Sequence, residues 1–374
     1  MKIGINGRFL LKPFTGIGTY TQNLFFELAK IDQKNEYIFV VPSKVPTTIK
    51  LVMNCKNIKF KVLPEPKFGS GGIKKTWWEQ ISVPEFFEKE CVDVAIFSYA
   101  CNPWTKDWYK KGIKTIVTVH DCIPWVNKKY RRGFTSKLYH LQSKNAVALA
   151  DVVLTVSESS KKQIAKVCGV KKSKIHVLYN GVCNCYLSSS TSKILNEFDL
   201  KPRGYLLYVG GYDVRKNVRY LALEYLKFND KYQNIPLVMA GAGILSGKLY
   251  DSFEIDGKGI KKTGFLDEKD LAELYRNCLA FVNFSEEEGF NIPALEAATS
   301  GAPLILSNIP VHREIYGECA LLVDTKKDGA GAAAFEKIVD KIEQKKLRQK
   351  SLKIAKNYSF KASAKKLLDT LKII

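Results

Sequence analysis

Short apolar segments alternate with amphipathic segments along almost the whole chain. Runs of β-branched and apolar residues predict strands at Lys2–Asn6, Tyr37–Val41, Lys59–Leu63, Val92–Phe97, Lys114–Val119, Val152–Val156, Lys174–Leu178, Tyr205–Val209, Leu237–Ala240, Leu279–Asn283, Pro303–Ile305 and Ala320–Val323. Helical periodicity predicts helices at Thr19–Lys30, Ser136–Ala150, Ser157–Val167 and Asp267–Asn277. This alternation is typical of parallel sheets that carry helices on both faces.

A polar segment rich in Ser and Thr, Cys183–Gly204, divides the chain nearly in half. A chain of 374 residues is long enough for two domains. We therefore expect an α/β protein with two doubly wound, Rossmann-like domains facing a central cleft, where the carboxyl ends of the strands bind ligands. The expected division is an N-terminal domain at 1–183, a linker at 184–203, a second domain at 204–356 and a C-terminal helix at 357–374 that packs back on the first domain.

The charge is unevenly distributed between the two halves. The chain has 59 Lys and Arg against 37 Asp and Glu, a net charge of +22. Residues 1–183 hold 30 basic and 13 acidic side chains, and residues 184–374 hold 29 and 24. The first half is therefore expected to face a phospholipid surface, a phosphorylated acceptor or a nucleic acid, unless the proteome is simply rich in lysine.

Several classes of protein are disfavoured by the composition. The chain has no apolar run of the roughly 18 residues that a spanning helix needs, and its N-terminus lacks the apolar core of a signal peptide. The nine cysteines form no zinc pattern, and the closest pair, Cys183 and Cys185, has no partner cluster nearby in the sequence. We expect free thiols in a cytoplasmic protein and no metal site, with a redox or metal role for the cysteines as the alternative.

The segment from Ser285 to Ala298 is the most specific motif. It follows an apolar strand and opens a helix, whose N-terminus attracts anions. Pro293 suits the first helical turn. Glu288 is expected on the loop that faces the cleft, and Glu296 one turn into the helix. The alternative is a solvated acidic loop that only caps the helix.

This segment resembles the E-x7-E signature of retaining glycosyltransferases of family 4, which have the GT-B fold. The resemblance extends along the chain, and the bacterial mannosyl- and rhamnosyltransferase branch is the most similar. It implies that Glu288 acts at the sugar and Glu296 at the ribose. It also implies that the backbone at the start of the helix binds the donor, at Gly289, Phe290, Asn291 and Ile292. Asn291 replaces the usual glycine, which puts the backbone geometry there in question.

Other motifs match the family in order. The glycine-rich turn at Gly16 and Gly18 opens a helix and corresponds to the loop over the donor diphosphate, although a plain strand–helix turn has the same pattern. His120 and Asp121 end a strand; the resemblance implies that His120 lines the sugar site and that Asp121 orients it or contacts the acceptor. A lone histidine there is more often a buried structural residue.

Phosphate binding in the second domain is predicted at Arg215 and Lys216, which follow two glycines. Arginine can donate to two phosphate oxygens and lysine adds a point charge. Arg215 substitutes for the usual family arginine, which is absent. The resemblance places loops with Gly241, Phe265 and Leu266 around the nucleotide.

Two clusters of basic and aromatic residues predict an acceptor or membrane surface, because Trp and Tyr favour membrane interfaces and cations favour anionic lipids. Their members are Lys74, Lys75, Trp77 and Trp78, and then Lys128, Lys129, Arg131 and Arg132. Ordinary loops with core tryptophans are the alternative.

Together these features predict a retaining, metal-independent glycosyltransferase at the inner face of the membrane. No Asp-x-Asp triad occurs in the chain. The expected co-substrate is a nucleotide sugar, GDP-mannose first and a UDP- or dTDP-sugar next, with a glycan or lipid-linked acceptor and no further cofactor. The alternatives are a nucleic-acid-directed protein, for which no motif is found, and an inactive nucleotide-sugar binder.

Overall fold

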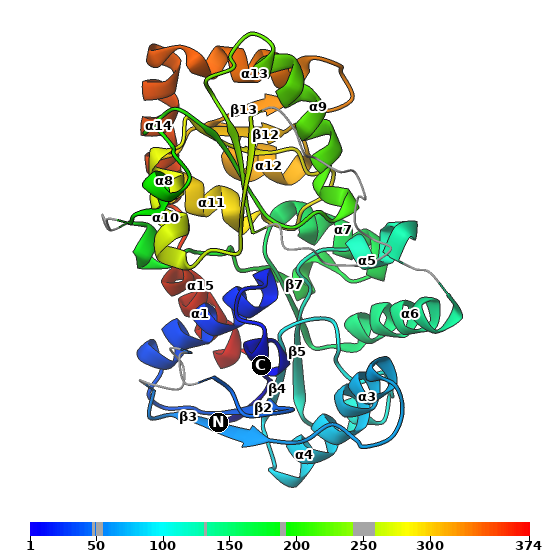
Figure 1. Ribbon diagram of the computed structural model, residues 1–374. Helices are drawn as coiled ribbons and strands as arrows, with labels where there is room; N and C mark the ends of the chain where they lie inside the picture. Colours follow the sequence, from blue (N-terminus) through cyan, green and yellow to red (C-terminus); the bar gives the residue numbers. More distant parts are fainter. Residues whose placement is uncertain (47–48, 50–54, 131–132, 188–191, 242–258) are drawn as a thin grey trace. The chain divides into compact units, whose positions relative to one another are not determined.

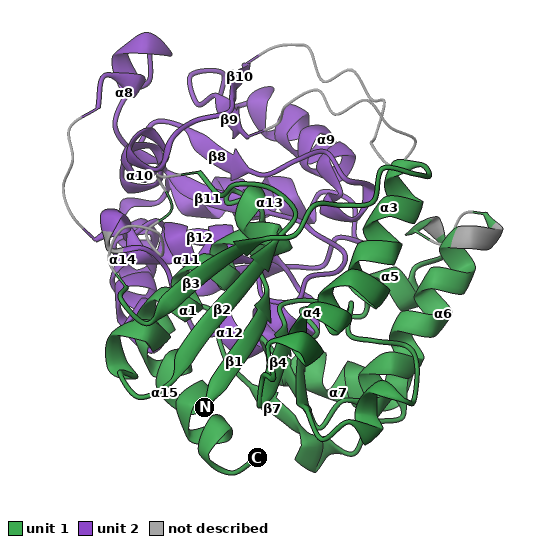
Figure 2. Cartoon of the chain, turned by 90° about the horizontal axis from the view of Figure 1, so that it is seen from below, with its two compact units in different colours: residues 1–180, 359–374 green, residues 181–358 purple. Residues whose placement is uncertain are grey.

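The computed structural model describes residues 1–46, 49, 55–130, 133–187, 192–241 and 259–374 (Figure 1). The chain forms two compact units, which Figure 2 shows in different colours. Unit 1 consists of Met1–Asn180 and Ser359–Ile374, and unit 2 of Gly181–Tyr358. The residues expected as a linker, 184–203, therefore belong to unit 2.

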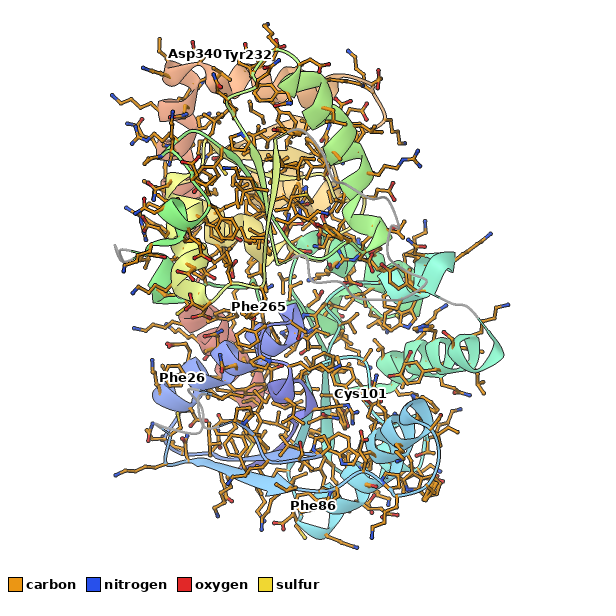
Figure 3. The ribbon with its side chains drawn as sticks, in the orientation of Figure 1. Phe26, Phe86, Cys101, Tyr232, Phe265 and Asp340 are labelled. Carbon is orange, nitrogen blue, oxygen red and sulfur yellow. The ribbon has the colours of Figure 1, made fainter. Side chains whose placement is uncertain are left out.

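Unit 1 contains a seven-stranded parallel sheet with the order β3-β2-β1-β4-β5-β6-β7. Its strands are β1 (Lys2–Asn6), β2 (Glu36–Val41), β3 (Ile58–Val62), β4 (Val94–Phe97), β5 (Lys114–Thr118), β6 (Val152–Thr155) and β7 (Ile175–Val177). Its helices are α1 (Gly16–Ile31), α3 (Gly71–Trp77), α4 (Val83–Lys89), α5 (Ile123–Val126), α6 (Phe134–Leu149), α7 (Glu158–Cys168) and α15 (Phe360–Lys372). The core includes Cys101, which is labelled in Figure 3.

The C-terminal helix α15 lies beside α1 within unit 1 (Figure 1). Its apolar face is buried, including Phe360 and Leu367, and Ser359 caps its start by accepting a hydrogen bond from the Ala362 amide. The last residues of the chain thus contribute to the core of the unit in which the chain begins.

Unit 2 contains a six-stranded parallel sheet with the order β10-β9-β8-β11-β12-β13. Its strands are β8 (Leu206–Val209), β9 (Leu237–Ala240), β10 (Ile260–Gly264), β11 (Ala280–Asn283), β12 (Leu304–Ser307) and β13 (Ala320–Val323). Its helices are α8 (Ile194–Glu197), α9 (Val218–Asn229), α10 (Glu268–Asn277), α11 (Ile292–Thr299), α12 (Pro310–Tyr316), α13 (Ala330–Val339) and α14 (Lys341–Ala355).

Both sheets are doubly wound, which confirms the predicted fold class. All twelve predicted strands are present, and most of them have apolar runs buried on both faces, as parallel sheets require; the edge strand β3 is the main exception, with Val62 53% exposed. The edge strand β10 was not predicted. Its sequence Ile-Lys-Lys-Thr-Gly lacks an apolar run, since an edge strand is covered less completely.

Candidate active site

The strand order of unit 2 reverses between β8 and β11, which are neighbours in the sheet. A topological switch point of this kind is where doubly wound sheets bind ligands, because the loops leaving the two strands diverge there. The loop after β8 carries Arg215 and Lys216, and the loop after β11 carries Glu288. The fold therefore brings these three residues, predicted from separate motifs, to the same edge of the sheet.

The two cations bind the Glu288 carboxylate directly. Arg215 Nη1 lies 2.9 Å from Glu288 Oε2, and Lys216 Nζ lies 2.5 Å from Oε1. The hydroxyl of Ser285 also donates to Oε1 at 2.8 Å. The side chains of Glu288 and Lys216 are only 7% and 12% exposed, so this is a buried ion pair rather than a surface one.

Burial affects the pKa values of both Glu288 and Lys216. Burial alone would raise the pKa of Glu288, but Arg215 and Lys216 hold it far below its usual value. Burial lowers the pKa of Lys216, and the Glu288 carboxylate opposes this shift. Asp213 Oδ1 also lies 3.7 Å from Arg215 Nε, so the compact site contains two positive and two negative side chains. An anionic ligand would therefore be bound by the two cations individually and not by a net positive charge.

The backbone after β8 is shaped by residues that tolerate unusual conformations. Gly210 has a φ of +150°, which is open only to glycine in practice. Asp213 then accepts a hydrogen bond from the Arg215 amide and starts the 3₁₀ turn that holds both cations. Asn217, in the left-handed region, ends this turn and begins α9. The sequence Asp-Val-Arg-Lys-Asn is therefore a local scaffold for two cationic side chains.

Glu296 lies on α11 in the same unit, but its described contacts are with tyrosines. The Tyr275 hydroxyl donates to Glu296 Oε2 at 3.1 Å, and Tyr186 provides a second hydrogen bond. Burial raises the pKa of Glu296 to about 7, against an ordinary value of 4.5. The two glutamates of the E-x7-E segment therefore have pKa values shifted in opposite directions.

Asn291 occupies the position at which the sequence left the backbone geometry in question. Its φ of 72° and ψ of 69° lie in the left-handed region, which glycine adopts freely and asparagine adopts more readily than most residues. The replacement therefore preserves the sharp turn that starts α11. His312, Tyr316 and Ser307, which hold this region, were not identified from the sequence because they lie on the next strand and helix.

The other predicted donor residues of unit 2 have different environments. Gly289 is buried, and the side chain of Phe290 packs against Tyr316 and Tyr358, so Phe290 could contribute to a ligand site only through its backbone. Ile292 is partly buried at the start of α11. Gly241, Phe265 and Leu266 follow the adjacent strands β9 and β10, and the Phe265 ring is 64% exposed (Figure 3).

In unit 1, the backbone of the turn before and at the start of α1 leaves no room for a side chain at Gly18. Gly16 is the first residue of α1, and Thr15 caps this helix by accepting a hydrogen bond from the Gly18 amide at 3.2 Å. A Cβ atom at Gly18 would lie 2.0 Å from the Lys12 carbonyl oxygen. The turn itself therefore requires a glycine at position 18, and the role of Gly16 and Gly18 at the donor diphosphate stays a prediction.

His120 lies between the ends of adjacent strands. Its Nε2 is 3.0 Å from the Ser98 carbonyl oxygen, which fixes Nε2 as the protonated nitrogen of the neutral ring. Burial lowers the pKa of His120 to about 4, and Tyr20 contacts the ring edge-on. Asp121 Oδ1 accepts a hydrogen bond from the Ile123 amide and so stabilises the start of α5.

The predicted cluster around Trp78 is partly wrong. Trp78 is fully buried, and its indole donates to the Leu63 carbonyl at 2.6 Å, so it belongs to the core and cannot contact a membrane. Lys75 lies 3.6 Å from the fully buried Glu79 carboxylate. The Lys75 ammonium group therefore acts on Glu79. Burial raises the pKa of Glu79, and the positive charge of Lys75 opposes that rise.

The remaining members of these clusters lie on two surfaces of unit 1. Trp77 is 42% exposed and contacts the exposed Phe68, while Lys74 is partly buried on the same helix. A separate hollow of about 590 Å³ lies against α5, α6 and α7, and it is lined by Trp125, Lys128, Lys137, His140, Leu141, Lys144 and Val167. Arg131 and Arg132 lie outside the described residues, and the structure does not describe the side chain of Lys129.

Among the residues that the structure describes, one trio could hold a metal ion. The sulfur atoms of Cys183 and Cys185 and a carboxylate oxygen of Glu268 lie within 4.8 Å of one another. From the sequence we expected no partner cluster near these two cysteines. In the folded protein, however, α10 brings the Glu268 carboxylate close to both. None of the nine cysteines is in a disulfide.

Comparison with known families agrees with this geometry. Residues 14–183 match the family described as Glycosyltransferase Family 4, and residues 203–341 match the family described as Glycosyl transferases group 1. The protein is therefore a member of the family 4, group 1 glycosyltransferases. This finding confirms the resemblance inferred from the E-x7-E segment.

Two curated relatives are bacterial mannosyltransferases. O-antigen chain mannosyltransferase B of Escherichia coli is 27% identical over 233 residues, which cover 60% of this chain and 61% of that protein. O-antigen chain mannosyltransferase RfbU of Salmonella typhimurium is 31% identical over 226 residues, which cover 59% and 60%. The match thus spans about three fifths of the length of each relative.

Solved structures show the same fold over the whole chain. Sucrose-phosphate synthase from Thermosynechococcus elongatus has a TM-score of 0.75 at 16% identity and covers 100% of this chain and 98% of that one. HepE of Anabaena in complex with UDP and glucose has a TM-score of 0.74 at 15% identity, with 100% and 99% covered. At this identity the likeness establishes the fold alone, which is GT-B.

Proposed function

We propose that the protein transfers a hexose, with mannose favoured, from a nucleotide-diphosphate sugar to a glycan or lipid-linked acceptor in the synthesis of a surface polysaccharide or glycolipid. The observation that carries this proposal is the buried group of Arg215, Lys216 and Glu288 at the switch point of unit 2. GDP-mannose is the first candidate donor because the curated relatives are mannosyltransferases. UDP- and dTDP-sugars are the next candidates.

In the proposed reaction, the bond between the anomeric carbon and the diphosphate oxygen breaks, and the acceptor oxygen bonds to that carbon on the same face. The acceptor proton passes to an oxygen of the leaving diphosphate, so configuration is retained without a protein nucleophile. Arg215 and Lys216 stabilise the charge that develops on the diphosphate. Glu288 contacts the sugar hydroxyls, and Glu296 accepts hydrogen bonds from the ribose. From unit 1, His120 is proposed to contact the sugar and Asp121 the acceptor.

A panel of nucleotide sugars tests the donor assignment. A ligand that binds only the folded protein stabilises it by about 2.7 kcal/mol at 100 times its Kd, so the true donor should raise the melting temperature most. The same donors are then tested for hydrolysis and transfer, with free nucleosides as the matched control. Absence of any shift or sugar release across the panel would contradict the proposed function.

We expect the reaction to be independent of metal ions and to retain configuration. The charge that a metal would neutralise is assigned to Arg215 and Lys216 here. Transfer should therefore continue in EDTA, and NMR of the product should show the anomeric configuration of the donor. Complete loss of activity in EDTA that manganese restores would refute the assigned role of the two cations, and an inverted product would refute retention.

Attachment to the inner face of the membrane is proposed for the hollow on unit 1. Residues 123–149, which carry most of its lining, contain six Lys or Arg and no Asp or Glu. Leu141, which is 53% exposed, adds apolar surface between the lysines, whereas Trp125 is buried in the core of unit 1. Among the described residues, no helix is long and apolar enough to span a bilayer. Peripheral binding through charge and partial insertion is therefore the form of attachment that this surface supports.

Anionic vesicles test the membrane proposal. Each Lys or Arg near an anionic surface contributes about 1 kcal/mol, and the Debye length falls from about 10 Å at 0.1 M salt to about 3 Å at 1 M. The protein should co-sediment with anionic vesicles at low salt and leave them at high salt. The double variant Lys137→Glu/Lys144→Glu should lose this binding, whereas Lys345→Glu/Lys350→Glu on α14, with the same change in charge, should keep it. Equal binding of both variants would exclude this surface.

A further inference from the structure

The left-handed turn at Asn291 is held by two residues of one helix. Asn291 Nδ2 lies 2.9 Å from His312 Nε2, and the Tyr316 hydroxyl donates to the Asn291 carbonyl oxygen at 2.9 Å. His312 and Tyr316 are one turn apart on α12, and both are fully buried. The helix after β12 thus holds the residue immediately before α11 by its side chain and by its backbone.

The hydrogen bonds around His312 determine which nitrogen is protonated. The Ser307 hydroxyl donates to the Ser285 carbonyl at 2.5 Å, so that hydroxyl can only accept from His312. His312 Nδ1 lies 2.9 Å from the Ser307 carbonyl oxygen and 3.2 Å from the Ser307 hydroxyl. Nδ1 therefore carries the proton, and Nε2 accepts from the Asn291 amide.

His312 is neutral, because burial lowers its pKa to about 4, with Glu288 and Lys216 as the charged groups that act on it. A protonated ring would have no acceptor for the Asn291 amide. Among the described residues, the amide oxygen of Asn291 has no hydrogen-bond partner, so His312 is the only described anchor of this side chain.

The same hydrogen bonds extend to Glu288. The Ser285 carbonyl accepts a hydrogen bond from the Ser307 hydroxyl, and the Ser285 hydroxyl donates a hydrogen bond to Glu288 Oε1 at 2.8 Å. His312 is thus linked to the buried acid through Ser307 and Ser285, and to the start of α11 through Asn291. Both ends of the loop between β11 and α11 depend on one imidazole ring.

We propose that His312 is a positioning residue, which holds Asn291 in the left-handed conformation and so fixes the loop that presents Glu288 to the donor. This inference rests on the proposed function of that loop. Asparagine pays a conformational cost in the left-handed region that glycine does not. The His312 hydrogen bond offsets this cost, and the pair forms a substitute for a glycine at this position.

The proposal predicts a specific dependence between two substitutions. His312→Leu should weaken binding of GDP or UDP, whichever the wild type binds, by about tenfold or more, because the Asn291 amide is left without its acceptor. Asn291→Gly is the reference for the coupling, because glycine adopts the left-handed conformation without an anchor. The double variant Asn291→Gly/His312→Leu should bind within about threefold of Asn291→Gly, so His312→Leu should have little effect once residue 291 is glycine.

Calorimetric titration of the four proteins measures this coupling, with melting temperatures recorded in parallel. A double variant that binds as weakly as His312→Leu while both remain folded would show that His312 is only a core residue, and would overturn the proposal. If His312→Leu does not fold, a double variant that folds and binds supports the proposal, and one that does not overturns it.

A second measurement does not depend on donor binding and separates this inference from the proposed function. Imidazole nitrogen NMR of the wild-type protein should show His312 protonated at Nδ1 and not at Nε2 at neutral pH, with the Nε2 signal shifted in Asn291→Gly. Protonation at Nε2 would overturn the proposal even if the donor binds. A wild type that shows the expected signals but binds no nucleotide would contradict only the proposed function.

Discussion

Replacing Lys216 with alanine should weaken donor binding roughly 10- to 100-fold and also lower the free energy of unfolding by about 3–5 kcal/mol. The first effect follows from the loss of a charge-assisted hydrogen bond to the diphosphate. The second follows from the 2.5 Å contact between Lys216 and Glu288, both largely buried, since removal of one partner leaves a buried charge less well compensated. The sequence alone predicts only the first effect.

A double variant separates the two effects. Lys216→Ala/Glu288→Gln removes the buried negative charge along with its partner, so stability should recover while donor affinity does not. Arg215→Ala should lose donor affinity by a similar factor with a smaller loss of stability, because Lys216 remains beside Glu288 and Arg215 is more exposed, at 23%.

Isothermal titration with the donor and urea unfolding measure these effects. Lys231→Ala is the control, because this lysine pairs with Glu336 at an exposed position of the same unit and such pairs contribute little. If Arg215→Ala and Lys216→Ala both bind the donor with wild-type affinity, the diphosphate does not bind at this switch point.

The sequence allowed Arg215, Lys216 and Glu288 to be placed at the same edge of a sheet, because each follows an apolar strand. It could not show that they bind one another. Glu288 lies 73 and 72 residues from the two cations along the chain, and their contact depends on β8 and β11 being neighbours. The pairing of nonconsecutive strands is a property of the whole sheet that no local pattern encodes.

Trp77 and Trp78 show a second limit of sequence reasoning. They are adjacent and chemically identical, yet one is exposed and the other fully buried. Consecutive helical residues point about 100° apart, so Trp77 faces solvent while the Trp78 indole turns inward and donates to the Leu63 carbonyl. When two adjacent aromatic residues lie at the boundary between the buried and the exposed face of a helix, the sequence alone does not show which of the two is buried.

The pKa of Glu296 produces the second large effect. The pKa is about 7 in the folded protein and near 4.5 when the group is solvated, so between these values the unfolded chain releases a proton that the folded protein retains. The folded state therefore loses stability as pH rises from about 4.5 to 7, by about 3 kcal/mol in total. This sign is opposite to that of Glu288, whose lowered pKa stabilises the folded state above its unfolded pKa.

Glu296→Gln should therefore stabilise the protein without ligand at pH 8, by about 2–3 kcal/mol, and change its stability little at pH 5. At pH 5 the wild-type side chain is itself neutral, and a glutamine oxygen can accept the Tyr275 hydrogen bond that Glu296 accepts. Donor affinity should fall about tenfold, because a neutral amide binds ribose hydroxyls less strongly than a carboxylate does. Urea unfolding at both pH values measures the first effect, with the exposed Glu336→Gln as the control. A variant that is less stable than the wild type at pH 8 would show that burial of the ionised Glu296 carboxylate costs the folded protein little, and would contradict the raised pKa as the source of this effect.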